Sequence, residues 1–458
     1  MAYTVDQSTG TGVQGAYDEI FYVVRETVLF NSPKFRYLLK VTIDGVVVGN
    51  FKQLPNNNDC AVFMIEQILS SYVHQDENVE QLGVVQPDGS FLTTKIFATN
   101  QDAIKTVLVE FGYEKAADAN SAPVTTMIAP LATSLRVING SLRANTVSAS
   151  APNAANVFEL KNPAGALLST SQKNYVVENQ YGALAFLNGD DVGSDACAYF
   201  HVTYYTAAGV AINTGYFTND TAQGGKAPAA GLTDDQSLLY IGCFPANLEF
   251  QAIDTTIRPS SNSNWAYYSL QAASSTTLLG NQASQQVLFY NMCNTRYNNQ
   301  TNGKFPGEYY VSWWNNLGGI DNLVFDGASK VLDQITRETF YSIGGNAFDA
   351  GNTVAYDKRP SEGGTTSAGN QTNTTIVLNT REQNPLYLNE LMQSLASSPR
   401  VYVYSKPSVQ QSGMLGKGKT YVRCVVSDIS INYQTGLNDK ISSYSVTLNL
   451  SRRRPNNK

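Results

Sequence analysis

One stretch of the chain, from Phe305 to Gly327, restricts the possible folds more than any other. An aromatic segment, Tyr309 to Trp314, runs into a polar Asn-Asn-Leu-Gly-Gly turn, and a second apolar segment follows the turn. Large side chains alternate on both faces of the first segment, so a strand here must lie between two packed layers, or between one layer and another subunit. Gly318 and Gly319 supply the positive-φ positions that a tight reversal requires. We therefore predict a β-hairpin that is buried on both sides and carries no evident catalyst.

The composition of the chain favours β-structure over disorder. Charged residues make up only 15% of its 458 residues, whereas Asn, Ser, Thr, Gly and Tyr are abundant. A chain with few charges and many aromatic residues has enough apolar surface to form a packed core. We predict a mainly β fold of multi-domain antiparallel β-sandwiches with two or three short covering helices.

The strand and helix patterns divide the chain into three predicted domains. Residues 1–113 are expected to form an N-terminal β-sandwich with one helix, which the polar residues Asn56–Asp59 cap. Residues 114–300 are expected to hold a linker and a middle β domain. Residues 301–458 are expected to form a C-terminal β domain with a basic tail and one helix, which Asn384-Pro385 opens.

Both predicted helices have an apolar face, and two segments are predicted to lack regular structure. The face of the first helix consists of Val62, Ile65, Leu69 and Tyr72. The face of the second consists of Leu388, Leu391, Met392 and Leu395. The polar, Gly-rich stretches Thr218–Asp235 and Gly344–Asn373 are predicted as exposed loops that reach neighbouring molecules.

Charge is unevenly distributed along the chain. The whole chain carries −6, but residues 401–458 hold nine Lys or Arg against two Asp, so this region carries +7 and the remainder −13. A basic end on an acidic body suits head-to-tail packing or a neighbour of opposite sign, and the net charge gives no general attraction to nucleic acid. We expect Arg452, Arg453 and Arg454 in the tail to contact an acidic partner; taken by itself, the segment Arg452–Lys458 also fits a solvated, flexible terminus.

The cysteines and the N-terminus indicate a protein made in a cytoplasm. Five cysteines are scattered without a C-x-x-C pair, which predicts reduced, mostly buried thiols. The N-terminus lacks a basic region followed by an apolar one, so no signal peptide is expected. No apolar run approaches the ~18 residues that a membrane span requires.

One phosphate-binding pattern occurs in a context that argues against nucleotide binding. Gly413–Thr420 fits G-x-x-x-x-G-K-T, a pattern that requires a helix to begin at the Lys-Thr pair. A β-branched segment follows Thr420 instead. We predict a basic hairpin loop here and no bound cofactor.

Catalytic and metal-binding constellations are weak in this sequence. His74 and His201 are the only histidines and have no Cys or acidic residue at ligand spacing. The pairs Asp190-Asp191 and Asp234-Asp235 are sequence neighbours, whereas glycoside hydrolysis requires two acids that face each other across a cleft. The loop Asn188–Asp195 departs from the Ca²⁺-loop spacing, so we prefer a turn there. We expect no catalytic residue, no metal and no enzymatic activity.

Two groups of segments are similar to sequences of one class of virion proteins. The first group comprises Tyr17–Val24, Asn31–Tyr37, Leu54-Pro55 and Ile68–Val73, and the second comprises Trp314–Phe325 and Leu395–Val403. Together they resemble the uncharacterised β-rich structural proteins of tailed bacteriophages, in which an extended strand, an N-x-L/Y-G-G turn and a terminal sandwich recur. The similarity touches both ends of the chain and skips most of residues 114–300. Its motifs carry packing, so it transfers no site residue, and it implies a virion component of the tail, collar or baseplate.

We therefore expect a non-enzymatic virion structural protein of a bacteriophage that acts through subunit–subunit assembly as a symmetric homo-oligomer. Its partners would be further copies of itself and other virion proteins, with no direct nucleic-acid binding and no membrane. The candidate interface residues are Trp313, Trp314, Asn315, Gly318, Gly319, Arg452, Arg453 and Arg454.

The alternative is a receptor- or carbohydrate-binding protein on the same sandwich scaffold. The chain has 27 Tyr, 19 Phe and 3 Trp, and such rings form sugar-stacking platforms when they line an open groove. Trp265 and Trp313 are the candidates for binding a host-surface glycan. Core and subunit contacts are the preferred interpretation of most of these aromatic residues.

Overall fold

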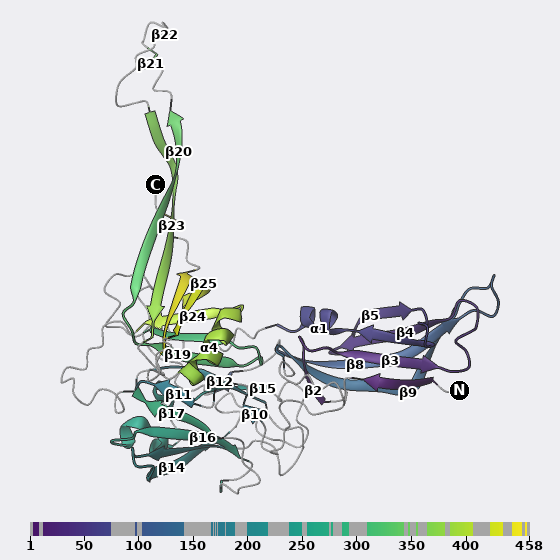
Figure 1. The fold of residues 1–458 in the computed structure, drawn as a ribbon, viewed down its shortest axis with the longest axis horizontal. Coiled ribbons are helices and arrows are strands. Elements are labelled where there is room, and N and C mark those ends of the chain that lie inside the picture. Colours follow the sequence, from purple (N-terminus) through teal and green to yellow (C-terminus); the bar gives the residue numbers. More distant parts are fainter. Residues whose placement is uncertain are drawn as a thin grey trace.

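The structure is a computed structural model that describes residues 3–8, 12–74, 97–98, 103–141, 166–167, 169, 171, 173–178, 180–187, 199–218, 238–249, 254–273, 276–277, 286–292, 309–342, 347–348, 354–355, 364–380, 385–405, 422–433, 442–450 and 454–455. The predicted mainly β fold is confirmed: layered sheets dominate, with three short α-helices among the described residues (Figure 1). Most strand pairs within these ranges are antiparallel, but two pairs there are parallel, β2 with β9 and β11 with β17.

The N-terminal unit is a sandwich of two sheets. One sheet has the order β1-β3-β6 and the other β2-β9-β8-β4-β5. The bounds of its elements are β1 Tyr3–Ser8, β2 Gly12–Gly15, β3 Phe21–Glu26, β4 Arg36–Ile43, β5 Val46–Gln53, β6 Cys60–Met64, α1 Glu66–Tyr72, β8 Ile104–Lys115 and β9 Val124–Ile138. β9 pairs with β8 and β2, so this sheet continues beyond residue 113, where we expected the domain to end.

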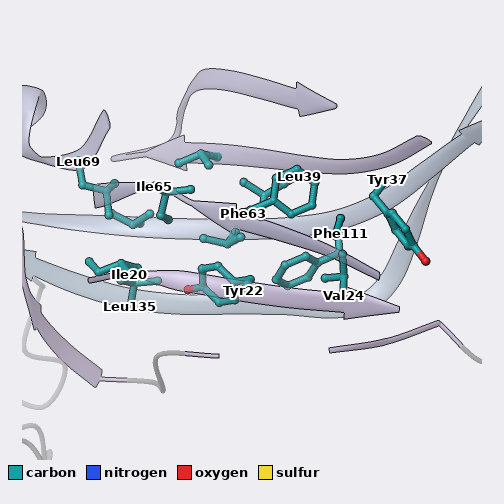
Figure 2. Close-up of a cluster of buried hydrophobic side chains, with 14 of the residues drawn as sticks. Ile20, Tyr22, Val24, Tyr37, Leu39, Phe63, Ile65, Leu69, Phe111 and Leu135 are labelled. Atoms are coloured by element: carbon teal, nitrogen blue, oxygen red, sulfur yellow. The ribbon is translucent and has the colours of Figure 1, made fainter. Parts of the chain in front are cut away.

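Alternating side chains of the two N-terminal sheets form one core. In β3, Tyr22 and Val24 are fully buried, while Phe21, Val23 and Arg25, which alternate with them, are partly exposed. Figure 2 shows that the two buried side chains meet Phe111 and Leu39 from the opposite sheet. The alternation of side chains along these strands therefore buries one face of each sheet.

The first helix is shorter than the sequence indicated. Residues 60–64 form β6, which pairs with β3, and the helix occupies only Glu66–Tyr72. Ile65 and Leu69 are buried as predicted, but Val62 and Tyr72 are exposed. The prediction of a helix from residue 60 was wrong because strand pairing with β3 outweighs a local apolar spacing that also fits a helix.

The middle unit contains two further sheets. Their orders are β10-β12-β15-β7 and β11-β17-β16-β13-β14. The bounds of its elements are β7 Phe97–Ala98, β10 Ala166–Leu167, β11 Lys173–Val176, β12 Ala183–Leu187, β13 Tyr199–Tyr205, β14 Ala211–Thr218, β15 Leu238–Gly242, α2 Pro245–Glu249, β16 Tyr267–Ala273 and β17 Val287–Asn291, with 3₁₀ turns at Thr255–Ile257 and Pro259–Ser261. β7 comes from the first 113 residues but pairs with β15 of this unit.

The C-terminal unit is built on one large sheet with the order β19-β18-β24-β25-β26-β23-β20, and β27 pairs with β23 off this path. The bounds of its elements are β18 Tyr309–Trp314, β19 Ile320–Phe325, β20 Lys330–Ser342, β21 Ala347–Phe348, β22 Val354–Ala355, β23 Gly364–Asn379, α4 Pro385–Ser397, β24 Val401–Ser405, β25 Val422–Tyr433, β26 Ser442–Leu450 and β27 Arg454–Pro455. The predicted second helix is confirmed, since Pro385 opens α4 and its four predicted apolar residues are buried.

The described cysteines are buried thiols. Cys60, Cys243 and Cys424 form no disulfide, whereas Cys197 and Cys293 lie outside the described residues. Burial raises the pKa of the Cys424 thiol to about 12 and raises the pKa of Cys243 further in the same direction. Both thiols are therefore neutral at physiological pH. None of the helices in the described ranges is both long and apolar enough to span a membrane.

Candidate functional site: a buried hairpin and a projecting arm

The β18–β19 hairpin is closed by the side chain of Asn315. Its Oδ1 accepts hydrogen bonds from the backbone N–H of Leu317 at 3.0 Å and of Gly319 at 2.8 Å. Gly318 has a φ of 82°, a conformation that costs little only for glycine. The predicted tight reversal is thus confirmed, but the expectation of a positive φ at Gly319 was wrong, because Gly318 alone of the two has one.

This turn packs against the N-terminal unit. The Ser141 N–H donates to the carbonyl of Asn316 at 2.6 Å, and the Ser141 hydroxyl donates to Asp18 at 2.7 Å. A Cβ atom on Gly318 would lie 2.5 Å from the Asn139 oxygen, and one on Gly140 would collide with the Leu317 carbonyl. Two glycines therefore allow the backbones of two units to touch directly.

One face of β18 packs on the C-terminal core. Trp313 is fully buried in a cluster with the apolar face of α4, and its indole N–H donates to the Ser394 hydroxyl of α4 at 3.0 Å. A buried tryptophan requires such an acceptor, because an unmet N–H is costly away from water.

The other face of β18 packs on the middle unit. Trp314 meets Tyr240 of β15 edge to face, with ring centroids 5.5 Å apart, and Tyr310 shares a buried cluster with Met292. One polar contact from β19 adds to this surface, since the Asn322 side chain donates to the Ala183 carbonyl at 2.9 Å. Asp321 lies on the face of Trp313, where it accepts hydrogen bonds from the Ser169 hydroxyl at 2.8 Å and from the Ser394 hydroxyl of α4 at 3.4 Å.

The hairpin thus joins all three units, and this corrects the predicted role of its residues. Trp313, Trp314, Asn315, Gly318 and Gly319 are all buried, and the layers that cover them belong to the same chain. We expected these residues at a contact between subunits. They lie instead at contacts within one subunit, because the chain itself supplies both packed layers.

The arm is a second feature, which we did not predict from the sequence. We use this name for β20 together with residues 364–374 of β23. The arm extends away from the body of the molecule (Figure 1). Every β20 residue from 332 to 341 is exposed, including the large apolar side chains Leu332 (41%), Ile335 (54%), Phe340 (51%) and Tyr341 (71%).

The exposed apolar residues occupy both faces of the arm. The register with β23 shifts once, between Glu338 and Thr339, and the extra residue belongs to β23, so β20 alternates without interruption. Ile335 and Tyr341 therefore share one face, and Leu332 and Phe340 share the other. A signal was present in the sequence, since β20 is rich in β-branched and aromatic residues.

The basic tail partly meets the arm. Arg454 and Pro455 form β27, which pairs with Thr372 and Gln371 of β23. Arg452 and Arg453 lie outside the described residues. Part of the predicted loop Gly344–Asn373 is strand, because residues 364–373 belong to β23.

The aromatic residues proposed for sugar binding are not open platforms. Trp265 is 3% exposed and packs edge to face against Tyr204 and Tyr268. A row of half-buried tyrosines does cross four strands of the middle unit, with neighbouring centroids 4.7 to 5.6 Å apart; it comprises Tyr205, Tyr267, Tyr290 and Tyr175. These rings stack largely on one another, so they cover the faces that a sugar would need.

The remaining candidates give no assembled site within the described ranges. His201 is buried beside Tyr216, and no group of three or more His, Cys, Asp or Glu residues with metal-binding geometry occurs in that part of the chain. The stretch Gly413–Thr420, the Asn188–Asp195 loop with its acidic residues, and Asp234-Asp235 lie outside the described residues.

Comparisons with known proteins do not identify the chain. No protein-family model and no curated protein matches it. A solved structure of E. coli alpha-2-macroglobulin in its native conformation is similar to it with 10% sequence identity and a TM-score of 0.19. The match covers 82% of this chain and 21% of that protein, so the chain spans about a fifth of its length. Similarity this low supports no argument about function.

Proposed function

We propose that the chain is a non-enzymatic structural subunit of a bacteriophage particle, and that it assembles with neighbouring subunits through its arm. The observation that carries this proposal is the exposure of apolar side chains on both faces of the arm. The assignment to a virion, in its tail, collar or baseplate, comes from the sequence resemblance alone.

A two-stranded ribbon such as the arm needs contacts beyond its own two strands. An isolated hairpin is marginally stable in water, and a sheet normally packs at least one face on a core. The arm has no such core among the described residues, although it carries large apolar side chains on each face. The contacts that such a ribbon requires would then come from other molecules, and burial of Ile335, Phe340 and Tyr341 would favour their association.

β18 provides an internal comparison. It also carries large side chains on both faces, and both of its faces are covered by packed layers of the same chain. β20 also carries large apolar side chains on both faces, but no layer of the described residues covers them. This favours layers that neighbouring subunits supply.

We predict that threonine at the four exposed apolar positions of the arm abolishes self-association. The variant combines Leu332→Thr, Ile335→Thr, Phe340→Thr and Tyr341→Thr, and it keeps a high strand propensity because threonine is β-branched. Light scattering over a range of concentrations should give multiples of the 49.8 kDa protomer for the natural chain. The variant should remain at the mass of one protomer.

A matched control removes equally exposed apolar side chains elsewhere. Val46 and Val124 are 65% and 67% exposed on the N-terminal unit, and Val46→Thr with Val124→Thr should leave the assembly unchanged. An arm variant that assembles as the natural chain does would contradict the proposal, as would a natural chain that is monomeric at every concentration.

A further inference from the structure

The open edge of the arm lies on β20. β20 is the last strand of its sheet, so within the described residues one of its edges has no strand beside it. The free side of β23 is partly taken by β27 at Thr372. An open edge presents a row of N–H and C=O groups that another strand can pair with. Natural edges are often blocked by proline or by charged side chains, especially lysine; residues 331–342 of β20 contain no proline or lysine, and their charges are Asp333, Arg337 and Glu338.

The two charges on one face of β20 are arranged symmetrically about Ile335. Asp333, Ile335 and Arg337 share this face, whereas the other two charges of the strand, Lys330 and Glu338, lie on the opposite face. Asp333 and Arg337 are four residues apart, a distance of roughly 13 Å along a strand, so their charged groups lie too far apart to pair within one arm. Both side chains are exposed, and Asp333 Oδ1 accepts a hydrogen bond from the Thr374 hydroxyl at 2.6 Å.

We propose that β20 pairs with β20 of a second copy of this chain as an antiparallel, two-fold symmetric ribbon with Ile335 opposite the partner's Ile335. In this register Asp333 faces the partner's Arg337, and the symmetry repeats the same pair on the other side of Ile335. Opposite charges directly across a strand pair are favourable, and here they flank an apolar contact. This inference rests on the proposed function and names the partner of the arm.

Symmetry and charge together disfavour the registers centred on the charged residues Asp333 and Arg337 and on Thr336. A two-fold axis perpendicular to the sheet places a residue opposite itself, so only registers centred on a residue are possible. Centres at Arg337 or Asp333 would place like charges opposite each other, which is unfavourable. A centre at Thr336 would place Ile335 opposite the partner's Arg337 and leave Asp333 without an opposite charge. The sequence of β20 therefore favours Ile335 as the centre.

A charge exchange tests the pairing. Asp333→Arg alone would place two arginines opposite each other at both symmetric positions, and Arg337→Asp alone would do the same with two aspartates. We expect each single variant to weaken dimerisation roughly tenfold or more. The double variant Asp333→Arg/Arg337→Asp restores opposite charges in the same register and should recover dimerisation. Sedimentation of the full chain measures all four proteins, and their thermal melting curves check that each is folded.

A cysteine pair tests the register itself. Ile335→Cys should form a disulfide-linked dimer under mild oxidation, because residues at the axis have Cα atoms within reach of a disulfide. Thr336→Cys is the matched control one residue away and should form far less of the cross-linked dimer. The unsubstituted chain measures the background cross-linking from the natural cysteines. Equal or better cross-linking at position 336, or a double charge variant as weak as the single ones, would overturn the inference.

The outcomes separate this inference from the proposed function. If the four-threonine arm variant loses assembly but the charge and cysteine variants behave as the natural chain does, the arm binds another surface, and only the inference fails. If the Ile335→Cys variant cross-links while particles form normally from chains with the four-threonine arm, the pairing is real and the assembly role of the arm fails.

Discussion

Replacing Trp313 by alanine is expected to lower the free energy of unfolding of the C-terminal unit by about 3–5 kcal/mol, the usual cost of deleting a fully buried large aromatic side chain. Trp313 is fully buried and joins β18 to the apolar face of α4. The substitution removes the buried surface, leaves a cavity and deletes the hydrogen bond to Ser394. Urea denaturation followed by circular dichroism measures this loss. The urea midpoints of the variant and the natural chain are compared, because the three units need not unfold in one step.

Two milder variants separate the contributions to this loss. Trp313→Phe keeps most of the apolar contact and removes the indole N–H, whereas Ser394→Ala keeps the ring and removes the acceptor. Each should cost less than Trp313→Ala, with Ser394→Ala in the range of about 1–3 kcal/mol expected for a buried donor left unpaired. A Trp313→Ala variant that unfolds together with the natural chain would show that the hairpin is not anchored through this ring.

Replacing Gly318 by alanine is expected to destabilise the protein by about 2–4 kcal/mol, because two effects act at one position. The φ of 82° places a Cβ in a strained conformation, at roughly 1–2 kcal/mol. The same Cβ would lie 2.5 Å from the Asn139 oxygen in the N-terminal unit, so the two backbones would have to separate. Thermal and urea denaturation report the sum of these effects.

The chain contains a matched control for each effect. Gly45 has a φ of 80°, and a Cβ atom there would have nothing within 4 Å of it, so Gly45→Ala measures the backbone strain alone. Gly140 meets Leu317 across the same contact without a positive φ, so Gly140→Ala measures the separation of the units alone. If Gly318→Ala costs no more than Gly45→Ala, the direct backbone contact between the units contributes nothing to stability.

The hairpin of β18 and β19 was predictable because its sequence carries two independent signals. Alternating large side chains indicate burial on both faces, and Asn315 with the following glycines indicates a tight reversal. Both signals act locally, and both are confirmed. What covers the two faces depends on contacts distant in sequence, such as Trp314 with Tyr240. The sequence therefore predicts that both faces of β18 are buried. It does not predict that the layers covering them belong to the same chain.

The arm was missed for a different physical reason. Glycine, serine and asparagine in the segment from 364 to 373 are typical of loops, and they hid a strand that the ladder to β20 holds in place. We placed the end of the N-terminal domain too early, at residue 113, for a similar reason. The strand Val124–Ile138 follows a polar segment, but it pairs along most of β8. Long-range pairing outweighs local composition in both cases.

Hydrogen–deuterium exchange would show whether the arm is the element through which the protein assembles. The full chain would be compared at a dilution where it is monomeric and at a concentration where it assembles. We predict that backbone amides of β20, from residue 331 to 341, become protected on assembly, while those of the N-terminal core keep the same rates. Exchange from the arm that is equally fast in both states would contradict an assembly role for this ribbon.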